Sequence, residues 1–237
     1  MSGHSKWANI KHKKAKEDAK RGHTFTKIIK EITVSAKSGG IPENNPQLRQ
    51  LIDKAKSANM PAENITRAIK KGTGELPGVS YESITYEGYG PGGTAVIIEA
   101  LTDNKNRTVA DLRHIFGRHN GNLAETGAVN WMFENLGVIR GTIQDKTEDE
   151  IFEELMDYDI NDISLEDNLF TITTAMQALF TVKDVLTKLG MKVEDAELEW
   201  ISKTNLEVDA ETEEKAFAFF EAIEDNDDVQ NVYSNIN

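Results

Sequence analysis

The sequence predicts an α+β protein: an N-terminal three-helix bundle followed by two α+β domains of the ferredoxin-like (split β-α-β) type, one inserted in the other. Its 237 residues suit two or three compact units. Apolar residues recur at three- and four-residue spacing up to residue 72, and strand and helix patterns alternate after it. We therefore expect a basic helical domain with an N-terminal arm at 1–78, an α+β domain at 79–135 plus 205–237, and an inserted acidic α+β domain at 136–204.

Three amphipathic helices account for the first domain. A helical pattern begins at about Glu17 and stops at the glycine pair 39–40. Asn45 can cap a second helix, Pro61 lies at the start of a third, and Gly72 ends it. Such short helices can bury their apolar stripes only against one another, which predicts a small bundle. In order, the stripes are Phe25, Ile28, Ile29, Ile32 and Ala36; Leu48, Leu51, Ile52 and Ala55; and Ile65, Ala68 and Ile69.

Beyond a glycine-rich linker at 72–78, strands and helices are mixed. The continuous apolar run after Gly93 is typical of a buried strand, and Thr108 is expected to cap the helix that follows. Two split β-α-β patterns can be drawn through this part of the chain. The expected strands cover 80–90, 93–103, 129–143, 168–175, 196–203 and 229–236, and the expected helices cover 108–121, 147–157, 176–190 and 211–226.

Composition excludes several classes of protein. The chain contains no cysteine, which rules out disulfides, thiolate nucleophiles and cysteine-ligated metals. It has no run of about 18 apolar residues, as a membrane span requires. The basic N-terminus lacks the apolar stretch of a secretory signal. These features favour a cytoplasmic protein without a membrane partner.

Charge is distributed very unevenly along the chain. The net charge is −13, but residues 1–72 carry 16 Lys and Arg against 6 Asp and Glu, whereas residues 73–237 carry 11 against 34. A basic N-terminal third predicts contact with nucleic acid. The inserted part, 136–204, has 16 acids and 6 bases, which predicts a solvated surface that repels nucleic acid and suits basic proteins. Two alternatives stay open for the basic end: a solvated tail, or a tail that folds onto the acidic C-terminal part.

The basic arm is the main candidate site. Its cations would release condensed counterions from phosphates, which gives affinity without reading sequence. An aromatic ring among them can stack on an unpaired base, worth about 1–3 kcal/mol. The bundle would add a secondary basic surface. The candidate nucleic-acid-binding residues are Lys6, Trp7, Lys11, Lys13, Lys14, Lys16, Lys20, Arg21, Lys27 and Lys30.

A glycine-rich loop is the second candidate. Gly88, Gly90 and Gly93 formally match the dinucleotide fingerprint, but that fingerprint needs a helix directly afterwards and a strand follows here. A turn between two strands is therefore the better interpretation. Its exposed backbone could still approach RNA closely. The residues of this possible backbone-approach loop are Tyr89, Gly90, Pro91 and Gly92.

Catalytic and metal sites are not expected. His114 and His119 are five residues apart, which does not place both on one helical face. No carboxylate–histidine spacing typical of a metal site occurs, and no nucleophile–base motif is recognisable. We expect no cofactor, no metal, no small-molecule substrate and no enzymatic activity.

Four blocks together resemble the YebC/PmpR family: GHSKWANIKHKKAKEDAKRG, TKIIKEI, YEGYGPGGTAVIIEALTDNKNRTVADLRH and DDVQNVY. The resemblance covers essentially the whole chain and is weakest in 136–204. The SKWANIKH and YEGYGPGGTA stretches are far more specific than a lone glycine motif. The resemblance supports the arm residues from Lys6 to Arg21 as functional positions.

The resemblance implies three domains, a helical one and two α+β ones, of which one interrupts the other. It implies a cytoplasmic protein described as a probable transcriptional regulator that binds promoter DNA. Other members are described as translation factors on the ribosome, among them a mitochondrial translational activator and bacterial forms that relieve stalls at proline runs. The family has no established enzymatic activity or cofactor.

Two functions therefore compete. A promoter-DNA-binding regulator would need a groove-reading element, and the acidic bulk would repel a long duplex. An RNA- or ribosome-associated translation factor suits a basic arm with Trp7, because irregular or single-stranded RNA offers unstacked bases. The acidic domains would then face basic ribosomal proteins. We favour the second on physical grounds.

Overall fold

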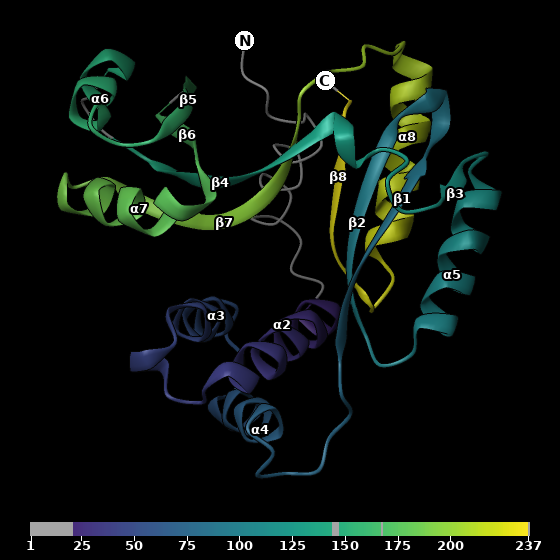
Figure 1. The fold of residues 1–237 in the computed structure, drawn as a ribbon, viewed down its shortest axis with the longest axis horizontal. Coiled ribbons are helices and arrows are strands. Elements are labelled where there is room, and N and C mark those ends of the chain that lie inside the picture. Colours follow the sequence, from purple (N-terminus) through teal and green to yellow (C-terminus); the bar gives the residue numbers. More distant parts are fainter. Residues whose placement is uncertain (1–20, 144–146, 167, 237) are drawn as a thin grey trace.

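The computed structural model describes residues 21–143, 147–166 and 168–236. Within these ranges the protein is α+β, as predicted, with a cluster of helices and two four-stranded antiparallel sheets (Figure 1). The arm residues Lys6, Trp7, Lys11, Lys13, Lys14, Lys16 and Lys20 lie outside the described residues.

The helical part consists of α2 (Arg21–Ser35), α3 (Pro46–Ser57) and α4 (Ala62–Gly72). Asn45 caps α3 as predicted, because its side chain accepts a hydrogen bond from the backbone N–H of Leu48 at 3.0 Å. The predicted stripes do face one another. The buried apolar core of this part is formed by Ile28, Ile32, Ala36, Leu48, Leu51, Ala55, Met60, Ile65 and Ala68.

The first sheet has the strand order β3-β1-β2-β8. Helices α5 (Lys105–Arg118) and α8 (Ala210–Glu224) pack on one face, where Leu112, Phe116 and Phe219 join the core. Strand β8 comes from the end of the chain, and all strands of the second sheet lie between β3 and β8 in sequence. The strands are β1 (Glu82–Tyr89), β2 (Ala95–Thr102), β3 (Asn122–Ala124) and β8 (Val229–Ser234).

The prediction that Thr108 caps α5 was wrong. The cap is Asn104, whose side chain accepts a hydrogen bond from the backbone N–H of Arg107 at 3.1 Å. Thr108 lies one turn inside the helix, buried, and its hydroxyl lies 2.8 Å from both Thr102 Oγ1 and Asp228 Oδ2. Both Asn and Thr can serve as caps, so spacing alone did not separate them.

The strands of the second sheet lie in the spatial order β5-β6-β4-β7. Along the chain, its elements follow the order β-α-β-β-α-β, as in a ferredoxin-like unit. Helices α6 (Glu148–Leu155) and α7 (Leu179–Lys188) contribute to its apolar core. Strand β5 was not predicted, because its few apolar residues, Ile160, Ile163 and Leu165, do not alternate regularly in a stretch rich in Asp and Asn. The strands are β4 (Phe133–Thr142), β5 (Ile160–Glu166), β6 (Leu169–Thr174) and β7 (Lys192–Ser202).

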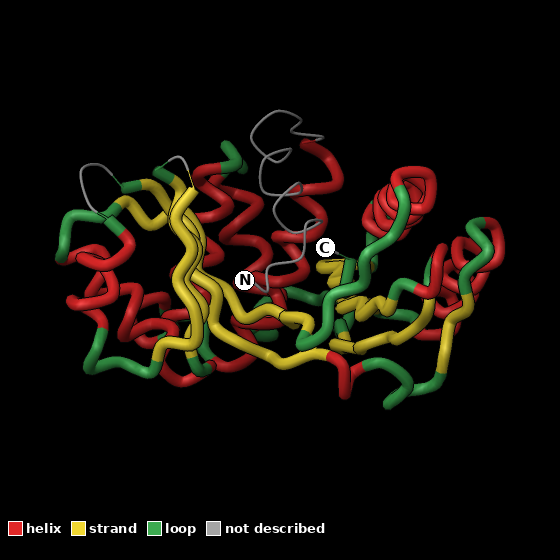
Figure 2. The backbone as a smooth tube through the Cα atoms, turned by 90° about the horizontal axis from the view of Figure 1, so that it is seen from above, coloured by secondary structure: helices red, strands yellow, loops and turns green. Residues whose placement is uncertain are grey.

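The two sheets lie side by side, linked by the long strands β4 and β7 (Figure 1). Seen from above, their helices lie at opposite ends of the molecule (Figure 2). A side-chain contact joins the sheets, because Trp200 Nε1 on β7 donates to Glu99 Oε1 on β2 at 3.1 Å. The division into three domains at residues 78, 135 and 204 stays a prediction.

Candidate nucleic-acid interface

Two of the expected contact residues of the first helix, Lys27 and Lys30, form contacts within the protein. Lys30 is buried, and its ammonium contacts Asp228 Oδ1 at 2.7 Å, the Asp227 carbonyl at 2.8 Å and the Leu101 carbonyl at 3.3 Å. Lys27 donates to the Glu224 carbonyl at 2.8 Å. The structure therefore places these two lysines in the junction between α2 and the first sheet rather than on an open phosphate-binding surface.

This junction, which we call the Asp228 junction, is rich in cations. Arg107 Nη2 on α5 lies 2.7 Å from Asp228 Oδ2, and Thr108 shares that oxygen. Burial by itself would raise the pKa of Asp228, but hydrogen bonds from Lys30, Arg107 and Thr108 lower it to about 2. The carboxylate is thus fixed in its charged form between α2, α5 and β8.

A second junction holds α3 against β7, and we call it the Asp195 junction. Asp195, Glu197 and Glu199 alternate along one face of β7. Lys54 of α3 reaches Glu197 Oε1 at 2.7 Å, and Arg140 of β4 forms a two-pronged pair with Glu199. Burial first, and then Glu197, raise the pKa of Asp195 to about 7. Acids outnumber bases here.

Open cations of the helical part lie elsewhere. Lys70 and Lys71 are exposed in the last turn of α4, and neither forms an ion pair with any of the described residues. Lys56 on α3 and Arg67 on α4 are also exposed, and each forms an ion pair within its own helix. Sequence reasoning did not single these residues out, although their positions opposite the apolar stripes could have indicated them. These four residues belong to the exposed basic surface of the helical part.

Helix α5 carries a further basic strip that sequence reasoning missed. Arg113, His114 and Arg118 are exposed, and Asp111 is the acid within the helix. Lys105 is paired with Glu82 across to β1 at 2.5 Å. This strip lies in an otherwise acidic part of the chain, so the charge average of residues 73–237 concealed it.

The glycine loop owes its composition to packing. Gly90 and Pro91 are buried, and a Cβ on Gly90 would lie 2.6 Å from the Phe219 ring of α8. Gly92 has a φ of 70° and would place a Cβ 2.3 Å from Thr212. Tyr89 donates to the Ala128 carbonyl at 3.1 Å. Close approach of the loop to α8 therefore accounts for Gly90 and Gly92 without RNA.

An exposed tryptophan was not anticipated. Trp131 is 66 % exposed, and its indole N–H donates to the Ala128 carbonyl at 3.1 Å. The buried carboxylate of Glu87 fixes this turn by accepting bonds from the backbone N–H groups of Gly127, Val129 and Asn130. An exposed aromatic ring of this kind is a place where an unpaired base could stack. Sequence reasoning assigned this role to Trp7 alone.

No group of three or more His, Cys, Asp or Glu side chains within residues 21–143, 147–166 and 168–236 is arranged to hold a metal ion. Among the same residues, no helix combines the length and apolarity needed to cross a bilayer.

The chain is similar to known proteins along nearly its whole length. Residues 5–75 match the family described as "TACO1/YebC protein N-terminal domain", and residues 81–236 match "TACO1/YebC second and third domain". A "Probable transcriptional regulatory protein" from Persephonella marina is 55 % identical over 238 residues, covering 99 % of this chain and 95 % of that protein. A protein of the same description from Chlorobium phaeobacteroides is 51 % identical, covering 100 % and 95 %.

A solved structure is also similar. The crystal structure of a conserved hypothetical protein from Aquifex aeolicus superimposes with a TM-score of 0.83 at 43 % sequence identity. The superposition covers 93 % of this chain and 91 % of that chain. The similarity in fold therefore extends over most of both chains.

Proposed function

The chain belongs to the TACO1/YebC family, and from that premise we propose that it is a non-catalytic, nucleic-acid-binding regulator of gene expression. We further propose that it works in the cytoplasm as an RNA- or ribosome-associated translation factor. The observation that carries the proposal is the separation of charge, with 16 bases against 6 acids in residues 1–72 and the reverse excess beyond. Such a basic segment binds phosphates through counterion release.

The positions of the cations support nucleic-acid binding centred on the basic arm. Lys27 and Lys30 are occupied at the Asp228 junction, so they add little to an open phosphate surface. The residues from Lys6 to Arg21 would make the main contacts, and Lys70 and Lys71 of α4 would extend them. Affinity would then depend strongly on salt and weakly on sequence.

The excess of acidic residues in the rest of the chain favours RNA over duplex DNA as the binding partner. A long duplex would bring phosphates against the acidic helices α6 and α8, which repel them. Folded RNA and ribosomal sites offer unpaired bases at isolated points, where Trp7 or Trp131 could stack. The acidic surfaces would then face basic ribosomal proteins.

Binding to promoter DNA is the second candidate. It is favoured by the description "Probable transcriptional regulatory protein" that the curated relatives share. The basic strip of Arg113, His114 and Arg118 on α5 would offer an additional phosphate contact.

Crosslinking in cells separates the two candidates. The tagged protein is irradiated in living cells, purified under denaturing conditions, and the attached nucleic acid is sequenced. The matched control is a variant with arm lysines replaced, Lys11→Gln, Lys13→Gln and Lys14→Gln. We expect enrichment of ribosomal RNA that the control loses. Recovery of promoter DNA without ribosomal RNA would refute the ribosome proposal and support the second candidate.

A further inference from the structure

The turn that carries Trp131 is anchored by buried residues on both sides. It lies between β3 and β4, where the chain passes from the first sheet to the second (Figure 1). Val129 and Phe133, two residues before and two residues after Trp131, are buried in an apolar cluster with side chains of β2. Glu87 adds its three hydrogen bonds to the backbone of the same turn. Trp131 is therefore carried on a backbone that packing and hydrogen bonds hold in place.

Trp131 keeps its ring in water although its neighbours are buried. Among the described Phe, Tyr and Trp residues it is the most exposed, at 66 %, ahead of Phe152 at 56 %. Its indole N–H is already bonded to the Ala128 carbonyl, so the surface that remains is mainly the apolar part of the ring. A ring held in this way loses little conformational entropy when a flat partner packs on it. A nucleobase is such a partner.

A lysine lies beside this turn. The backbone N–H of Lys203, which directly follows β7, donates to the carbonyl of Met132 at 2.8 Å. Ser202 fixes the chain at this point, because its hydroxyl donates to the Thr204 carbonyl at 2.7 Å and accepts from the Thr204 N–H at 3.2 Å. Lys203 is exposed and forms no ion pair with any of the described residues. Two turns that are far apart in sequence thus bring a cation and the exposed ring of Trp131 to the same place.

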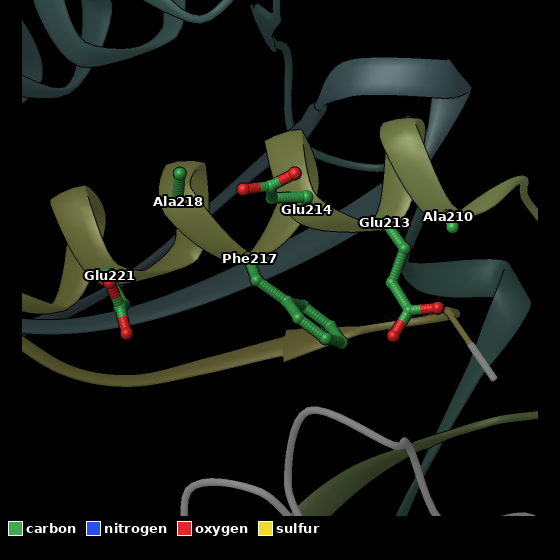
Figure 3. A pocket seen from close by; sticks show the side chains of 6 residues that line it. All are labelled: Ala210, Glu213, Glu214, Phe217, Ala218 and Glu221. Carbon is green, nitrogen blue, oxygen red and sulfur yellow. The ribbon is translucent and has the colours of Figure 1, made fainter.

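Two other aromatic positions on the surface lack such a cation. Phe152 on α6 is followed by Glu153 and Glu154, and that helix contains no base. A shallow pocket on α8 holds the Phe217 ring, and its lining includes three glutamates and no base (Figure 3). Every nucleotide of a strand carries a phosphate, which carboxylates repel. Charge therefore favours the Trp131 turn over these two positions as a contact for nucleic acid.

We propose that Trp131 and Lys203 form a platform for one unpaired nucleotide, in which the indole stacks on the base and the ammonium binds the adjoining phosphate. The platform rests on the proposed function and adds to it a second contact, distant in sequence from the arm. Glu125 and Glu134 are exposed on either side of Trp131 in the chain, so the platform has room for a single phosphate. It selects unpaired strands, because a base inside a duplex is already stacked on its neighbours.

The two residues contribute to binding in different ways. Stacking is a contact between apolar faces and releases no counterion, so its contribution to affinity is the same at every salt concentration. The phosphate contact of Lys203 does release counterions, and for a single strand each such contact adds about 0.7 to the slope of log affinity against log salt. The ring and the cation can therefore be separated by measuring affinity at several salt concentrations.

The platform is tested on the full chain by fluorescence anisotropy with a labelled, unstructured 20-nucleotide pyrimidine RNA. We expect Trp131→Ala to bind about tenfold more weakly with an unchanged salt slope, and Trp131→Phe to recover most of that loss because it keeps a ring. Lys203→Gln should bind more weakly, with the slope reduced by about 0.7. The matched control, Phe152→Ala, removes an exposed ring from α6 and should bind like the wild type.

A duplex made from the same RNA completes the test, because Trp131→Ala should bind it as well as the wild type does. Equal affinities of the wild type and Trp131→Ala for the single strand would overturn the platform and leave the proposed function standing. An equal loss on the duplex, or a Trp131→Phe protein as weak as Trp131→Ala, would also overturn it, because neither result fits stacking. An unchanged slope in Lys203→Gln would overturn the phosphate contact. Failure of the wild type itself to bind RNA would instead refute the proposed function, and the platform with it.

Discussion

The helical part meets the two sheets through two ion networks of opposite balance. At the Asp228 junction, Lys30 and Arg107 surround one carboxylate, and the pKa of Asp228 falls to about 2. At the Asp195 junction, three carboxylates share Lys54 and Arg140, and the pKa of Asp195 rises to about 7. The helical part is therefore held at one edge by a carboxylate with two cationic partners, and at the other edge by a junction in which two cations face three carboxylates.

The largest expected effect is at the Asp228 junction. Lys30→Met leaves the buried Asp228 carboxylate with fewer partners, so we expect a loss of about 3 kcal/mol in the free energy of unfolding. Urea denaturation followed by circular dichroism measures it. The matched control, Lys56→Met, removes an exposed lysine of the same domain and should change stability by less than about 0.5 kcal/mol. Equal effects of the two substitutions would contradict the description of a buried ionic contact.

A smaller effect is expected from Lys54 at the Asp195 junction. Its side chain is 41 % exposed and its pair with Glu197 is screened by solvent, so Lys54→Met should cost about 1 kcal/mol or less. Burial alone would lower the pKa of Lys54, but Glu197 and Glu31 raise it, so the lysine stays charged at ordinary pH. Urea denaturation at low and high salt tests this. A loss as large as that of Lys30→Met would remove the distinction between the junctions.

The two junctions should respond to pH in opposite directions. The folded protein holds the Asp195 proton more tightly than the unfolded chain, where the pKa is about 4, so this group makes stability fall as pH rises from about 4 to about 7. Asp228 has a lowered pKa, so its stabilisation is present above about pH 4 and is lost as pH falls toward 2.

Asp195→Asn tests the sign directly. Melting temperatures are measured at pH 5 and pH 8 for the wild type and the variant. The wild type should lose more stability than the variant over this interval, because only the wild type must ionise a carboxylate beside Glu197 and Glu199. A variant that loses as much as the wild type would show that Asp195 does not titrate in this range.

Sequence patterns predicted the elements whose signals are local. The apolar stripes of the three helices, the cap at Asn45 and the buried strand after Gly93 are all found. Strand β5 was missed because an edge strand with one half-buried face needs few apolar residues. The cap of α5 was misplaced by one turn because Asn104 and Thr108 both suit that role.

The candidate site was less accessible to sequence reasoning. Sequence alone does not distinguish a lysine that binds phosphate from one that pairs with a buried carboxylate. The ion pair of Lys30 with Asp228, almost 200 residues away, could therefore not be predicted. The glycine loop was correctly interpreted as a turn, but its close packing on Phe219 depends on the tertiary structure. The exposure of Trp131 likewise depends on the turn that Glu87 fixes.

The central claim is that the basic arm carries the affinity for nucleic acid. The most direct measurement is the salt-dependent affinity of the full chain and of a variant lacking residues 1–20 for a labelled single-stranded RNA. For the full chain, contacts to 6–10 phosphates predict a loss of roughly 10³–10⁵-fold between 50 and 200 mM salt. The shortened chain should lose most of its affinity and salt dependence while its melting temperature stays nearly unchanged. Unaltered RNA affinity in the shortened chain would contradict the account.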